Sequence, residues 1–92
     1  MFPIVKASPL AMRVRVPKIT NKDKLSYTIS RAMPFYAMQV GQAFWVPYSY
    51  RGGEAVAEAR AKIRAYNRLY AVFFYAIRHR DKSTHLEIVR LK

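Results

Sequence analysis

One long stretch in the second half of the chain has the polarity pattern of an amphipathic helix. Residues 54–69 contain no glycine or proline, and apolar side chains recur there at intervals of three and four. That spacing places Val56, Ala59, Ile63 and Tyr66 on one face of a helix. We therefore predict a helix over residues 54–69 with this face toward the core.

Shorter stretches alternate between apolar and polar side chains, as half-buried strands do. Residues 12–16 and 25–29 alternate and are rich in strand-forming types, so they predict a hairpin with a basic tip. A short apolar strand is predicted at residues 43–46. After the helix, residues 70–80 and 85–91 predict a second hairpin.

The last hairpin also has a predicted register. If its turn lies at residues 82–83, Arg78 falls opposite Glu87. Ile77 then falls opposite Ile88. A cross-strand pair of opposite charge would favour this register by about 0.2–1 kcal/mol.

The order of these elements, β-β-β-α-β-β, predicts an α+β fold. One helix would pack on one face of a small antiparallel sheet of about four to five strands. Residues 1–10 contain two prolines and no clear period, and we predict them to be an irregular N-terminal arm. Residues 11–92 have the length of a single domain.

The charge of the chain gives the first indication of its function. Its 92 residues include 17 lysines and arginines against 5 acidic residues, a net charge of +12 with neutral histidines. Residues 1–46 hold 7 basic and 1 acidic residue, and residues 47–92 hold 10 and 4, so no tail carries the excess. Solubility needs only about 2–8 charges in a small domain. The composition therefore predicts binding to a polyanion, and DNA above all.

Other chemistries find little support in the sequence. The chain has no cysteine, which excludes disulfides and cysteine-ligated zinc. His79 and His85 without a third ligand do not predict a metal site, and no nucleophile is accompanied by a base. No signal peptide and no apolar run of about 18 residues is present. We expect a cytoplasmic non-enzyme that uses no cofactor or metal and does not enter a membrane.

The predicted helix carries the first candidate interface. Arg60, Arg64 and Arg68 are spaced by four residues, which places them on one face, and Lys62 lies elsewhere on the solvent side. Guanidinium groups arranged in this way can follow a row of phosphates with charge-assisted hydrogen bonds. The alternative is an ordinary solvated helix face, although such faces usually carry charges of both signs.

The predicted strand at residues 12–16 carries the second candidate interface. Arg13 and Arg15 would share one strand face while Val14 and Val16 share the other. A two-stranded ribbon can enter the major groove, where arginine is the commonest reader of guanine. The alternative is a half-exposed strand with its polar side in water.

A third candidate combines aromatic side chains with a cation. Trp45, Tyr48 and Tyr50 precede Arg51, and exposed aromatic rings beside an arginine suit stacking on unpaired bases. The alternative is that these rings belong to the core. Because the arginines are more orderly than the exposed aromatic residues, we expect duplex DNA to be preferred over single strands or RNA.

Residues 34–47 contain the pattern P-F-x-x-M-x-V-G-x-x-F-x-V-P. It resembles a segment of small, largely uncharacterised basic proteins encoded by bacteriophages, in which an alanine- and arginine-rich helix and two strands follow. The resemblance continues at residues 55–69, at Phe73 or Phe74, and at residues 88–91. It implies a phage origin and a host-takeover, DNA-associated or regulatory setting.

Two further hypotheses follow from the charge and the aromatic content. The chain could instead dock on an acidic host protein, such as a polymerase subunit or a defence factor, and inhibit it by charge complementarity. A small chain with 13 aromatic residues is also expected to leave apolar surface that a homodimer would cover.

Overall fold

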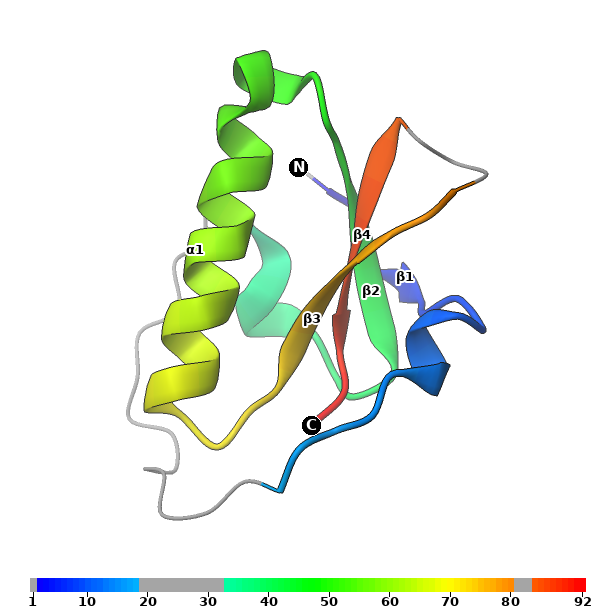
Figure 1. Cartoon of the computed structure of the whole chain (residues 1–92), viewed down its shortest axis with the longest axis vertical. Helices are drawn as coiled ribbons and strands as arrows, with labels where there is room; N and C mark the ends of the chain where they lie inside the picture. The colour runs from blue at the N-terminus through cyan, green and yellow to red at the C-terminus, as the bar shows by residue number, and fades with distance from the viewer. Residues whose placement is uncertain (1, 19–32, 81–83) are drawn as a thin grey trace.

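The computed structural model describes residues 2–18, 33–80 and 84–92. In these residues a four-stranded antiparallel sheet, in the order β1-β2-β4-β3, is covered by one α-helix on one face (Figure 1). The predicted α+β class is confirmed. The elements are β1 (Val5–Lys6), η1 (Ala11–Arg13), η2 (Pro34–Ala37), β2 (Gln42–Pro47), η3 (Tyr50–Gly53), α1 (Glu54–Leu69), β3 (Phe74–Arg78) and β4 (His85–Arg90), where η marks a 3-10 helix.

Helix α1 has the predicted bounds. Ala59, Ile63 and Tyr66 are buried as expected, while Ala55 takes the buried position that had been expected of Val56. Gly53 precedes the helix with a φ of 92°, a left-handed conformation that a residue without a Cβ adopts readily. The chain can therefore turn sharply into α1 at this point.

The main core lies between α1 and the sheet, and Phe35 is at its centre. The Phe35 ring meets the rings of Phe44, Tyr66 and Phe74 edge-on, at centroid distances of 5.3, 5.4 and 5.1 Å. Phe35 belongs to η2, a segment to which the alternation pattern assigned no element. Edge-to-face contacts among aromatic rings add to the stabilisation from buried apolar area, so this segment fixes the sheet to the helix.

A second, smaller cluster covers the opposite face of the sheet. The N-terminal segment (residues 2–18) packs Ala7 and Ala11 against Ala43, Ile77 and Val89 there. Figure 1 shows η1 and α1 on opposite sides of the sheet. Residues 5–6, within the predicted irregular arm, form the edge strand β1 and pair with β2. The beginning of the chain is therefore part of the folded body.

The strand predicted at residues 12–16 was wrong. Residues 11–13 form η1, and residues 14–18 have no regular secondary structure. The Ser8 hydroxyl accepts a hydrogen bond from the Ala11 N–H at 3.1 Å, which starts the 3-10 turn instead of a strand. The proposed partner strand at residues 25–29 lies outside the described residues.

The second hairpin forms as predicted but in a different register. Arg78 lies opposite Leu86 and Ile77 opposite Glu87, so both predicted pairs were wrong by one residue. The core decides the register, because Phe74 and Leu86 must both face α1, and a shift of one residue would turn one of them away. Strand β3 is also shorter than the predicted residues 70–80.

The outer edge of β3 is partly sealed by a helix side chain. Asn67 donates from Nδ2 to the Phe74 carbonyl at 2.7 Å and accepts the Phe74 N–H at Oδ1 at 2.8 Å. Phe74 turns these two backbone groups away from β4, so Asn67 replaces a neighbouring strand. These bonds hold the last turns of α1 against β3.

Candidate nucleic-acid interface

Three arginines form a row along α1. Arg60, Arg64 and Arg68, called the arginine row below, are all exposed and follow one another at about 6 Å along the helix axis. Among the described residues, the only oppositely charged side-chain types within 4 Å of each other are His79 and Glu87. The guanidinium groups of the row are therefore not neutralised by carboxylates in the described part of the chain.

The row borders a groove between α1 and the edge of the sheet. Arg60 and Arg64 line this groove with Ile63 of the helix and Tyr75 and Ala76 of β3. The Tyr75 side chain is 43% exposed. The row therefore runs beside the edge strand β3, an arrangement that helical spacing alone could not reveal.

Lys62 does not extend the row. Two residues along a helix correspond to a rotation of about 200°, so Lys62 points away from Arg60 and Arg64. Its side chain is also half-buried, whereas the arginines of the row are exposed. The helix therefore offers three aligned cations rather than a broad patch of four.

The structure separates Arg13 and Arg15 from the arginine row. Both are exposed, but they belong to the N-terminal segment, on the face of the sheet opposite α1 (Figure 1). Arg13 ends η1 instead of standing in a strand, so these residues do not form the predicted face of a β-ribbon. One straight surface cannot present both sets of arginines to a ligand.

Arg51 occupies an unusual backbone conformation just before α1. Its φ and ψ are 54° and 39°, and Gly52 continues in the same left-handed region. Such angles are uncommon for a residue with a Cβ. The Arg51 guanidinium carbon lies 5.5 Å from the centroid of the Tyr50 ring, within the range of a cation–π contact.

Sequence reasoning missed a buried polar cluster on the sheet face that the N-terminal segment covers. Glu87 has no exposed surface. Its Oε2 accepts the Ser8 N–H at 2.8 Å, and its Oε1 accepts the Ser8 hydroxyl at 2.5 Å and binds His79 Nε2 at 2.7 Å. Serine and histidine thus both bind one carboxylate oxygen, an arrangement that ties three segments together. A lone acidic residue within an apolar strand was the signal that could have revealed the cluster.

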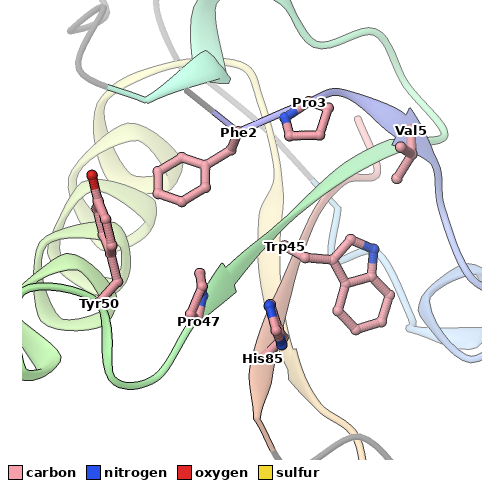
Figure 2. A pocket seen from close by; sticks show the side chains of 7 residues that line it. All are labelled: Phe2, Pro3, Val5, Trp45, Pro47, Tyr50 and His85. Atoms are coloured by element: carbon pink, nitrogen blue, oxygen red, sulfur yellow. The ribbon is translucent and has the colours of Figure 1, made fainter.

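An aromatic pocket lies at the other edge of the sheet. Figure 2 shows side chains from the N-terminal segment, from β2, from η3 and from β4 around one hollow. Trp45 and Tyr50 line this hollow. The half-buried Tyr48 does not; the guanidinium carbon of Arg78 lies 5.6 Å from the centroid of its ring. We call this hollow the edge pocket; it is lined by Phe2, Pro3, Val5, Trp45, Pro47, Tyr50 and His85.

Comparisons of the chain with protein-family models, with curated proteins and with solved structures find no match. We therefore infer the function from the geometry of the candidate sites. Within residues 2–18, 33–80 and 84–92, no helix has the length and apolar character needed to cross a membrane. In the same ranges, no three side chains of the metal-binding types gather at one point.

Proposed function

We propose that the protein binds duplex DNA by contacting its phosphates through the arginine row. The observation that carries this proposal is the alignment of three exposed arginines without a carboxylate partner among the described residues. Each guanidinium can donate two hydrogen bonds to one phosphate, and such charge-assisted bonds are about twice as strong as neutral ones. From the resemblance of residues 34–47 to basic phage proteins, we further propose a regulatory or host-takeover setting for this activity.

We also propose that the protein discriminates little between DNA sequences. Phosphate contacts position a protein on the duplex without reading its sequence. Arg13 and Arg15, which were expected to read bases, lie in a 3-10 turn and an irregular segment. The net charge of +12 adds a general attraction to the phosphate backbone. We therefore expect similar affinities for unrelated duplexes.

A salt series tests the proposal. Fluorescence anisotropy with a labelled duplex should give a log affinity that falls linearly with log salt, with a slope of about −3 or steeper, because each phosphate contact contributes about −0.9. An unlabelled duplex of unrelated sequence should compete equally well. Absence of binding at low salt, or affinity independent of salt, would refute the proposal.

A competition experiment distinguishes DNA binding from docking on an acidic protein. A protein whose surface is built for DNA should be stripped from an acidic protein column by excess unrelated duplex. Retention on that column in the presence of excess duplex would favour the inhibitor hypothesis, in which charge complementarity serves a specific protein partner.

A further inference from the structure

The edge pocket has walls that are held in place by ring contacts. The Phe2 ring stacks on Phe44 at 5.8 Å and meets Tyr50 edge-on at 5.5 Å. On the other side, the Trp45 ring lies 4.8 Å from the ring of His79. Rings that are already ordered lose little entropy when a ligand packs against them. The pocket therefore offers ordered aromatic surfaces to a flat group.

The size and chemistry of the pocket restrict the ligand further. Its volume is about 370 Å³, near the lower end of the range for small-molecule sites, about 300–1,000 Å³. None of the described residues that line it carries a carboxylate. The lining includes the imidazole of His85, whose Nδ1 lies 2.9 Å from Thr84 Oγ1, and the indole of Trp45. Aromatic walls with polar ring nitrogens suit a heterocyclic base.

Arg51 adds a cation beside one wall. Its guanidinium lies over Tyr50, whose side chain is 45% exposed and lines the pocket. The left-handed backbone of Arg51 would be less strained with glycine, which occupies the next two positions. Backbone strain of this kind is often found where a side chain is held for a function, and a phosphate is the group that a guanidinium binds best.

We infer that the edge pocket binds an unpaired nucleobase, with the attached phosphate held by Arg51. The inference goes beyond duplex binding and does not depend on the arginine row. The pocket lies at the β1–β2 edge of the sheet, whereas the row borders β3 at the opposite edge. The two sites can therefore be tested separately.

Trp45 provides a direct reporter, because it is the single tryptophan of the chain and lines the pocket. Its fluorescence should be quenched in a saturable manner by a short single-stranded oligonucleotide and by a nucleoside monophosphate. A blunt duplex of the same length should bind without this quenching. A higher affinity for the oligonucleotide than for the nucleoside monophosphate identifies a strand as the ligand. Equal affinities for the two identify a free nucleotide. No quenching by either would overturn the inference, whatever the duplex affinity.

Two substitutions of exposed side chains supply the comparison. Tyr50→Ala should weaken quenching by the single strand about tenfold or more, because one stacked base is lost. Val40→Ala shortens an exposed apolar side chain that lines neither the edge pocket nor the groove beside the arginine row, and it should leave quenching unchanged. Equal effects of the two substitutions would overturn the assignment of the pocket.

The role of Arg51 has its own test. Arg51→Gly keeps the left-handed backbone available and removes only the cation. The variant should bind a nucleoside monophosphate several-fold more weakly and the corresponding nucleoside as the unaltered protein does. Equal losses for the two ligands would contradict a phosphate contact at Arg51. In a background with alanine at all three positions of the arginine row, Tyr50→Ala and Arg51→Gly should have the same effects on pocket binding. A wrong prediction for the row can therefore be distinguished from a wrong prediction for the pocket.

Discussion

Replacing Glu87 with alanine is expected to lower the free energy of unfolding by several kcal/mol, because each buried hydrogen-bond donor left without its acceptor costs about 1–3 kcal/mol. The Glu87 carboxylate is fully buried and accepts both hydrogen bonds of Ser8. Without it, the Ser8 N–H and His79 lose their acceptor inside the protein, and an unmade buried hydrogen bond is costly. Urea denaturation followed by circular dichroism measures the change.

Two other substitutions show whether burial is the cause. Glu54→Ala removes an exposed glutamate from the first turn of α1 and should cost no more than about 1 kcal/mol. Ser8→Ala removes the hydroxyl and keeps the backbone N–H, so its effect should lie between the two. A loss at Glu87 as small as that at Glu54 would contradict the structural role of the buried cluster.

The buried cluster also connects stability with the edge pocket. Ser8 holds the N-terminal segment on the sheet, and Phe2 and Pro3 of that segment form one wall of the pocket. Weakening the Ser8–Glu87 bonds should loosen that wall. The shape of the edge pocket thus depends on a carboxylate that does not line it.

Replacing Arg60, Arg64 and Arg68 together with alanine should have the largest effect on DNA binding. The affinity for a duplex should fall at least about tenfold at ~150 mM salt, and the slope of log affinity against log salt should become shallower by about three units. Stability should not decrease, because the arginines are exposed and alanine is the best helix former. Anisotropy titrations in a salt series measure both quantities.

The N-terminal segment offers a control with the same change in charge. Arg13, Arg15 and Lys18 are exposed and lie outside α1. Their triple alanine variant also loses three positive charges, but it keeps the arginine row. We expect a clearly smaller loss of affinity and of salt slope. Equal losses in the two variants would show that binding depends on net charge and not on the row.

The elements that sequence reasoning predicted correctly depend on local patterns. The period of α1 persists over 16 residues, and the second hairpin is rich in strand-forming residues. The pattern at residues 12–16 covers only five positions, and an irregular segment with one side against a sheet produces the same alternation. The predicted register of the second hairpin was wrong for a related reason. The register is set by the residues that must face α1, and these cannot be identified from the hairpin alone.

The candidate sites likewise differ in whether local spacing or tertiary packing creates them. The arginine row could be predicted because helical spacing alone aligns its three members. The groove at Tyr75 could not, since it depends on how α1 docks against β3. The bonds between Ser8 and Glu87 join residues 79 positions apart, and no local pattern reports such a contact. The edge pocket likewise combines three segments that are distant in the sequence, residues 2–5, 45–50 and 85.

The position of the DNA on the protein tests the central claim most directly. In a titration of ¹⁵N-labelled protein with a duplex, followed by NMR, the side-chain Nε–H signals of Arg60, Arg64 and Arg68 should shift, together with backbone signals around Tyr75. The Nε–H signal of Arg13 should stay in place, because it belongs to the opposite side of the sheet. Shifts confined to the N-terminal segment, with the arginine row unaffected, would contradict the account.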